Sequence, residues 1–332
     1  MQIHIDTDIG GDIDDLCALA MVLNWPDAEL IGVTTVSEDR GRRAGYAKYA
    51  LRLAGRADVP VASGADVSQH PYRWWPGLPD EAAYWPEPTP AAPTPLEEAL
   101  SLLERSIEHG AVIGAIGPFT NLALLEKRSP GILRDAKLFL MGGYVFPPRP
   151  GFPRWGNNMD YNVQADARSA HYVVEHSNAT LIPLSVTVET ALRRSHLGTL
   201  RKSGPLPQLL ARQAEAFASD EQMETKYGKT CEALPDDIIN FLHDPLACAI
   251  ALGWNEGAEI SQLPLCSEIR DGWLNQTVAN GYKPTNIVTA VDGNKFSDFW
   301  VRTVAHFAVT RDFLNNHTGT LERPFSDDEQ ER

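Results

Sequence analysis

Short apolar runs alternate with longer segments of helical periodicity along most of the 332 residues. Seven short runs are typical of buried strands: residues 3–5, 30–35, 59–62, 111–116, 138–141, 179–183 and 286–290. Five longer segments are typical of helices: residues 14–23, 43–54, 96–109, 165–176 and 238–252. This alternation predicts an α/β fold with an open, mostly parallel (mixed) central sheet and helices on both faces. Ligands bind such sheets at the carboxyl ends of the strands.

Linkers and loops define the expected domain organisation. No stretch rich in Pro, Gly and Ser divides the chain, so we expect a single domain over residues 1–314 and an acidic, frayed tail over 315–332. Prolines and tryptophans gather in residues 70–95 and 145–158, which predicts two long loops. The first loop is either a lid over a site or a segment that packs on the scaffold.

Charge and composition exclude several classes of function. The chain has 29 Lys+Arg and 44 Asp+Glu, and the net charge of −15 disfavours binding to nucleic acids and to anionic membranes. No apolar run approaches the ~20 residues that span a bilayer, and the first residues resemble a strand rather than a signal peptide, so we expect a cytoplasmic protein. The four cysteines are scattered, which predicts neither disulfides nor a zinc site.

An acidic cluster follows the first expected strand. Five aspartates fall within residues 6–15: Asp6, Asp8, Asp12, Asp14 and Asp15. Capping of the next helix explains one or two of them, but clustered carboxylates repel one another. A bound divalent cation would resolve the repulsion, and a set of oxygen ligands indicates Ca²⁺ or Mg²⁺ rather than Zn²⁺.

One alternative starts from the same cluster. A D-x-D pattern after the first strand is also typical of phosphatases of the haloacid-dehalogenase type. Asp6 would then be the nucleophile of a Mg²⁺-dependent reaction. Gly10, however, stands where that pattern has Thr or Val.

The cluster resembles the N-terminal signature of the inosine-uridine preferring nucleoside hydrolases. That signature is D-x-D-x-G-x-D-D, and residues 6–15 carry a form two residues longer, D-T-D-I-G-G-D-I-D-D. Residues 241–247, F-L-H-D-P-L-A, resemble the family's H-D-P motif, and residues 160–162, D-Y-N, resemble its E-F-N segment. Residues 114–122, G-A-I-G-P-F-T-N-L, resemble its strand and turn near the metal. The resemblance implies a Rossmann-like sheet of the nucleoside hydrolase type.

The resemblance also implies a set of site residues. A Ca²⁺ ion would be bound by Asp8, Asp15, Asp244 and the main-chain carbonyl of Ile116, and Asp8 would also be the general base. Asp6 and Asp12 would steady these ligands. The catalytic set is completed by His243 near the leaving base, and the substrate-binding set is Asp14, Asp39, Asn158, Asp160, Asn162 and Trp75.

The implied reaction is Ca²⁺-dependent hydrolysis of the N-glycosidic bond of a ribonucleoside, which gives a free base and ribose. An alternative is a nucleoside- or sugar-binding protein without activity on the same fold. It is motivated by Asp39, Asp160 and Ser185, which stand where the family has Asn, Glu and Asp. The resemblance further implies a homodimer or homotetramer, and it leaves the preferred base open.

Overall fold

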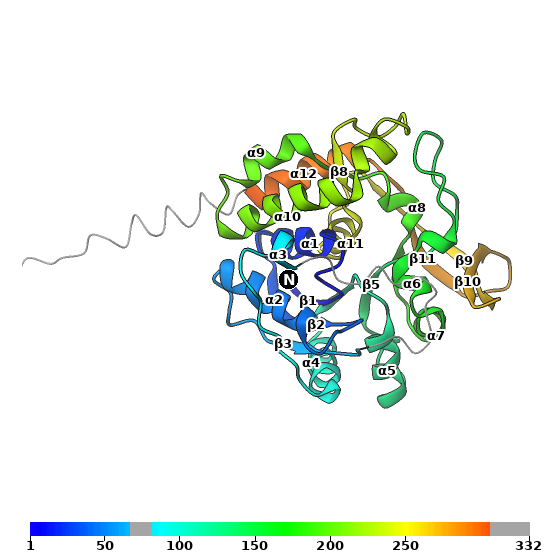
Figure 1. Ribbon diagram of the computed structural model, residues 1–332. Coiled ribbons are helices and arrows are strands. Elements are labelled where there is room, and N and C mark those ends of the chain that lie inside the picture. Colours follow the sequence, from blue (N-terminus) through cyan, green and yellow to red (C-terminus); the bar gives the residue numbers. More distant parts are fainter. Residues whose placement is uncertain (67–80, 306–332) are drawn as a thin grey trace, which may run out of the picture.

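The computed structural model describes residues 1–66 and 81–305. Within these ranges, nine strands form one sheet in the order β10-β9-β11-β6-β5-β4-β1-β2-β3 (Figure 1). The strands from β3 to β11 in this order are parallel, and β9 and β10 extend the sheet antiparallel at one edge. This confirms the expected mixed sheet. The strands are β1 (Gln2–Thr7), β2 (Glu29–Thr35), β3 (Val61–Ser63), β4 (Val112–Ala115), β5 (Lys137–Met141), β6 (Thr180–Ile182), β9 (Ala258–Arg270), β10 (Trp273–Val278) and β11 (Pro284–Val291).

Helices cover both faces of the sheet (Figure 1). One apolar core contains residues of α1 (Asp14–Val22), α2 (Arg42–Leu53), α10 (Pro205–Glu221), α11 (His243–Ala251) and α12 (Gly293–Ala305). A second core lies on the other face and contains residues of α4 (Leu96–Glu108), α5 (Thr120–Arg128) and α7 (Ala167–His176). The remaining elements are short: α3 (Glu81–Tyr84), α6 (Tyr161–Gln164), α8 (Leu184–Thr187), α9 (Leu197–Leu200), η1 (Asn157–Met159), η2 (Arg194–His196), η3 (Glu224–Gly228) and the pair β7 (Leu192–Arg193) and β8 (Ile238–Asn240).

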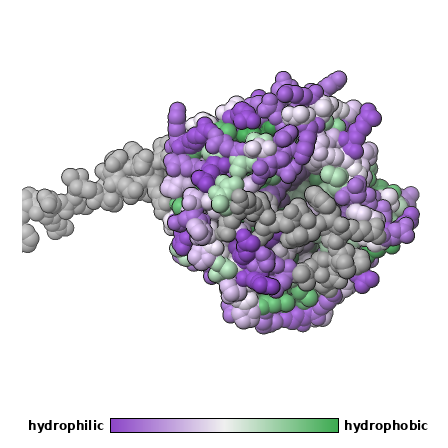
Figure 2. Space-filling view, in the orientation of Figure 1, coloured by the Kyte–Doolittle hydropathy of each residue, from purple (hydrophilic) through white to green (hydrophobic). Residues whose placement is uncertain are grey.

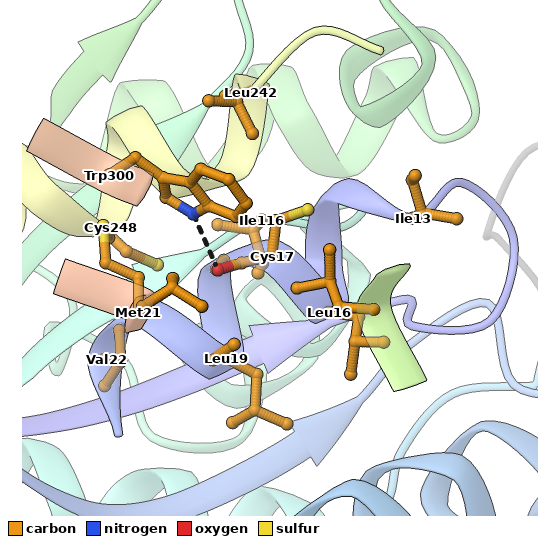
Figure 3. Close-up of a cluster of buried hydrophobic side chains, with 14 of the residues drawn as sticks. Ile13, Leu16, Cys17, Leu19, Met21, Val22, Ile116, Leu242, Cys248 and Trp300 are labelled. Carbon is orange, nitrogen blue, oxygen red and sulfur yellow. Dashed lines mark hydrogen bonds between the residues drawn. The ribbon is translucent and has the colours of Figure 1, made fainter. Parts of the chain in front are cut away.

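Apolar packing fixes α1, the helix that carries two of the clustered aspartates. Leu16, Cys17 and Met21 of α1 are at most 1% exposed, and they lie in the apolar cluster of Figure 3. Trp300 of α12 is fully buried over this helix, and its indole N–H donates to the Cys17 carbonyl at 3.1 Å. A helix held so closely leaves its first turn little freedom, which matters for the side chains placed there.

Two sequence predictions about local structure are wrong. The helix expected over residues 238–252 is divided into β8 and α11, with a break at 241–242. Pro245 explains the break, because its ring would clash with the carbonyl four residues earlier in a continuous helix. The first proline-rich stretch also contains one helical turn, α3, at the end that the structure describes. The described residues do not include 67–80, which contain Trp75, or the predicted tail at 315–332.

The exterior agrees with the composition. Hydrophilic residues dominate the face shown in Figure 2, as expected for a chain with a net charge of −15. Across residues 1–66 and 81–305, none of the helices has both the length and the apolar character required to cross a membrane. All four cysteines are free.

Candidate metal centre and substrate site

Three buried carboxylates meet where the first turns of α1 and α11 come together. Asp14 and Asp15 open α1, and Asp244 lies in the first turn of α11, which packs against α1. One carboxylate oxygen of each residue lies within 4.8 Å of the others. The three residues are 5%, 3% and 2% exposed, so protein surrounds them almost completely. We call Asp14, Asp15 and Asp244 the carboxylate triad.

The turn between β1 and α1 delivers the first two members of the triad. Gly10 in this turn has a φ of 105°, a conformation that favours glycine. A Cβ atom at Gly10 would lie 2.4 Å from Cδ2 of Tyr46, so only glycine lets the turn pack on α2. The sequence of the turn therefore sets where α1 begins.

The triad is electrostatically strained without a cation. Burial raises the pKa of Asp14, Asp15 and Asp244 well above the usual aspartate value, and repulsion among the carboxylates raises it further. The Thr7 hydroxyl donates to Asp15, which opposes only part of this effect. Because every atom of the triad that could bind a metal is a carboxylate oxygen, the triad fits a hard divalent cation, which would neutralise the repulsion.

Asp8, the predicted base, lies beside the triad but is not one of its three closely spaced residues. Its charge contributes to the raised pKa of each triad member. Burial raises the pKa of Asp8 itself, and the positive charge of Arg43 opposes that shift. A Cβ at Gly117 would lie 2.8 Å from Asp8 Oδ1, so the glycine after Ile116 permits this close approach.

The residues of the D-Y-N segment hold the ends of neighbouring strands. Asn162 Nδ2 donates to the Ile116 carbonyl at 2.9 Å and to the Met141 carbonyl at 3.2 Å. The structure thus joins two predicted site residues, Asn162 and Ile116, directly. Asp160 caps α6 and accepts from the backbone N–H groups of Val163 at 3.2 Å and Gly143 at 2.6 Å. Burial raises the pKa of Asp160 to about 6.

His243 precedes the third triad residue and faces a group of aromatic rings. Its Nδ1 lies 2.6 Å from the Thr187 hydroxyl, and that hydroxyl also lies 3.2 Å from the Leu184 carbonyl, so Nδ1 is engaged in a hydrogen bond. Burial lowers the pKa of His243 to about 3, and the ring is neutral at pH 7. The imidazole lies 5.3 Å from the Phe241 ring and 6.2 Å from the Trp155 ring, between centroids.

Two other predicted substrate contacts are exposed or half-exposed, and a third lies outside the described residues. The Asp39 carboxylate is 3.5 Å from the Arg42 guanidinium, and its side chain is 47% exposed. Asn158 is exposed within η1. Trp75 is not among the described residues. Trp85, the last tryptophan of the first loop, is 2% exposed and stacks on Tyr46 at 4.4 Å, so it serves packing.

Asp6 is enclosed in the protein interior. Its Oδ1 accepts from Thr34 at 2.6 Å and from Asn121 at 2.8 Å, and the residue is fully buried. Its Oδ2 is buried without a hydrogen-bond partner among residues 1–66 and 81–305, and burial raises the pKa of Asp6 to about 7. A carboxylate enclosed in this way cannot reach a phosphate ester, so the phosphatase alternative is wrong.

Sequence reasoning missed two polar residues that surround the site. Arg43 is 2% exposed, and its Nε donates to the Ser37 carbonyl at 2.8 Å while Nη1 donates to the Ile9 carbonyl at 3.1 Å. Asn240 donates its side-chain amide to Asp12. An arginine early in a helix is typical of a surface position, so nothing in the sequence signalled its burial. For Asn240, the sequence did offer one indication of a role near the site, because this residue comes four positions before Asp244.

Comparison with known proteins identifies the family of this chain. The family model for the inosine-uridine preferring nucleoside hydrolases matches residues 3–298. Uridine nucleosidase 1 from Arabidopsis thaliana is 31% identical over 212 residues, which are 58% of this chain and 59% of that protein. The match to the family model therefore extends from β1 to α12. The match to the Arabidopsis protein spans just under three fifths of that protein's length.

Solved structures show the same fold. A plant nucleoside hydrolase has a TM-score of 0.71 at 18% identity, and the match covers 92% of this chain and 98% of that one. A purine-preferring ribonucleoside hydrolase from Gardnerella vaginalis has a TM-score of 0.71 at 21% identity, with 93% and 99% covered. The family match over residues 3–298 confirms the predicted resemblance and the enzyme class, a nucleoside hydrolase. The chain belongs to the inosine-uridine preferring nucleoside hydrolase family.

Proposed function

We propose that this protein hydrolyses the N-glycosidic bond of ribonucleosides in a Ca²⁺-dependent reaction in which Asp8 is the general base. The observation that carries the proposal is the carboxylate triad, whose oxygens lie within 4.8 Å of one another in a nearly closed environment. In this proposal, the ion is held by the carboxylates of Asp8, Asp15 and Asp244 and by the main-chain carbonyl of Ile116. Asp14 then lies close enough to share in ion binding or to take a ribose hydroxyl.

A bound Ca²⁺ would supply positive charge that orients a water molecule and a sugar diol. The chain's own residues would do the rest. Asp8 would accept a proton from the attacking water, because its carboxylate lies beside the triad that would hold the ion. Asn162 would orient the ribose, because its amide is already fixed between two strand ends. Asp160 would face the 5′ side, with its position fixed by two backbone N–H groups.

The leaving base would lie near His243. A neutral imidazole whose Nδ1 is engaged with the Thr187 hydroxyl would present Nε2 to the base, so His243 would bind the base by a hydrogen bond rather than deliver a proton from an imidazolium. The names of similar proteins include a uridine nucleosidase and a purine-preferring hydrolase. The base is therefore best identified with a panel of purine and pyrimidine ribonucleosides.

The direct test is release of free base and ribose by the purified protein, with Ca²⁺ and with a chelator. We expect activity that chelation removes and Ca²⁺ restores. The variant Asp8→Asn keeps the shape of the side chain, and loss of a general base should lower kcat by about 10²–10⁴-fold. Activity that is indifferent to both the chelator and Asp8→Asn would contradict the mechanism. Tight nucleoside binding without turnover would instead support the non-catalytic alternative.

The remaining expectations, a cytoplasmic location and a homodimer or homotetramer, stay predictions. Size-exclusion chromatography with light scattering would measure the number of subunits in solution.

A further inference from the structure

The β1–α1 turn is longer by two residues than the family signature, and the added length includes a polar contact across the molecule. Asp12 Oδ1 accepts a hydrogen bond from the side-chain amide of Asn240, which lies 228 residues later in the chain. The same oxygen accepts from the backbone N–H of Ile13. Asp12 is therefore joined both to the start of α1 and to β8.

The two partners lie just before the carboxylate triad in each half of the chain. Asp12 comes two residues before Asp14, and Asn240 comes four residues before Asp244. A link between Asp12 and Asn240 thus crosses the same gap as the triad, between the start of α1 and the start of α11.

Each side of the link is anchored independently. Asn240 is 2% exposed and pairs in β8 with Leu192, and the backbone N–H of Leu242 donates to the Thr190 hydroxyl at 3.0 Å. On the other side, Arg43 donates to the Ile9 carbonyl at 3.1 Å, and Tyr46 packs against Gly10. The turn is held by α2 at its beginning and by Asn240 at its end, so it cannot absorb a displacement by bending.

We propose that Asp12, through its hydrogen bond with Asn240, is a positioning residue that sets the separation of Asp14 and Asp15 from Asp244. The inference rests on the proposed function, because the triad is taken to hold a divalent cation. Cation affinity depends steeply on ligand positions, and residues that orient metal ligands typically contribute about 10–100-fold. Asp12 acts through Asn240 in this scheme and does not itself touch the ion.

The experiment is a double-mutant cycle on Ca²⁺ binding by the full chain, measured by calorimetry with Asp12→Ala, Asn240→Ala and the double variant. We expect each single variant to lower Ca²⁺ affinity by about tenfold and the double variant to lower it no further than the weaker-binding single variant. Asp12→Asn keeps the accepting oxygen and should bind Ca²⁺ almost as tightly as the wild type. Asn178→Ala, which removes an exposed asparagine that donates to the Arg134 carbonyl, is the matched control and should leave affinity unchanged.

Several results would overturn the proposal. If Asn240→Ala leaves Ca²⁺ affinity unchanged while Asp12→Ala and Asp12→Asn both lower it, Asp12 acts through its charge and not through its position. Additive losses in the double variant would exclude the link, and so would a wild-type protein that binds no divalent cation. A wild-type protein that binds Ca²⁺ but releases no base would contradict only the proposed function. Thermal unfolding of every variant separates altered affinity from loss of fold, and Asp12→Ala creates no buried cavity because Asp12 is exposed.

Discussion

Two groups of buried carboxylates in this molecule differ in the groups that surround them. Glu38 and Glu126 are each 3% exposed, yet both are fully supplied with donors. Glu38 accepts from the Thr35 hydroxyl and from the backbone N–H groups of residues 39, 43 and 44. Glu126 accepts from the backbone N–H groups of residues 131 and 133 at 2.6 and 3.0 Å. The triad is buried to the same degree, but the strongest charge effect on each of its members comes from another carboxylate.

This difference separates structural carboxylates from carboxylates that need a bound cation to balance their charge. A buried carboxylate that accepts several N–H groups stabilises the chain around it. Three carboxylates that raise one another's pKa destabilise the folded state unless protons or a cation neutralise them. Burial alone therefore does not mark a functional aspartate or glutamate in this fold. What distinguishes the triad is burial together with the closeness of other carboxylates.

The largest expected effect comes from removing one charge of the triad. Asp244→Asn should lower activity by more than the ~10–100-fold that is typical for residues that only orient ligands. In the presence of a chelator at pH 8, the same variant should have a higher free energy of unfolding than the wild type, because one of three repelling groups is gone. Initial rates and urea unfolding curves measure the two effects.

Glu126→Gln is the matched control from the other group. Its amide would turn an N–H group toward the N–H of residue 131 or 133, so the free energy of unfolding should fall by ~1–3 kcal/mol. Activity should be retained, because Glu126 holds the connection from α5 to the amino end of β5, away from the triad. If the two variants shift stability in the same direction, the distinction between the groups is wrong.

The next effect concerns pH. The raised pKa values of the triad mean that the folded protein binds protons that the unfolded chain has already released, so this contribution to stability falls as pH rises above about 4. Ca²⁺ competes with these protons, and its stabilisation of the fold should increase from pH 5 to pH 8. At a Ca²⁺ concentration 100-fold above its Kd, the stabilisation should reach about 2.7 kcal/mol.

The measurement is the difference in free energy of unfolding with and without Ca²⁺ at each pH. A difference is required because His4 and His243, whose pKa values burial lowers to about 3, change stability in the opposite direction over part of this range. The curves of unfolding free energy with and without Ca²⁺ both contain the contribution of His4, so the difference between them does not. A Ca²⁺ stabilisation that stays constant from pH 5 to pH 8 would show that the triad does not exchange protons for the ion.

The sequence was sufficient for the parallel part of the fold and for the place of the acidic cluster. Buried parallel strands are continuous apolar runs, and all seven of the expected strands are present within a few residues. The β9–β10 hairpin was missed because it lies at the sheet edge, where half-exposed strands mix charged and apolar residues. Local patterns carry little information about such a hairpin, whose partners are set by the finished sheet.

Contacts between distant segments explain what was missed at the site. The sequence predicted that Asp15 and Asp244 meet, because the motifs resemble those of a known family, and the structure brings them together. It could not predict that Asp160 is occupied by two backbone N–H groups or that Arg43 is buried between two loop carbonyls. Such contacts depend on turn geometry, and the residue types involved are common at surfaces.

The smallest expected effect tests a predicted substrate contact outside both groups of carboxylates. Asp39 pairs with Arg42 at 3.5 Å and is half exposed, so Asp39→Ala should change the free energy of unfolding by no more than about 0.5 kcal/mol. If the Asp39 carboxylate binds a ribose hydroxyl, KM should rise about tenfold with little change in kcat, as loss of a charged hydrogen bond predicts. Asp58→Ala removes a similar surface pair with Arg56 and should leave KM unchanged. Equal KM values for both variants would assign Asp39 to the surface, as a partner of Arg42 alone.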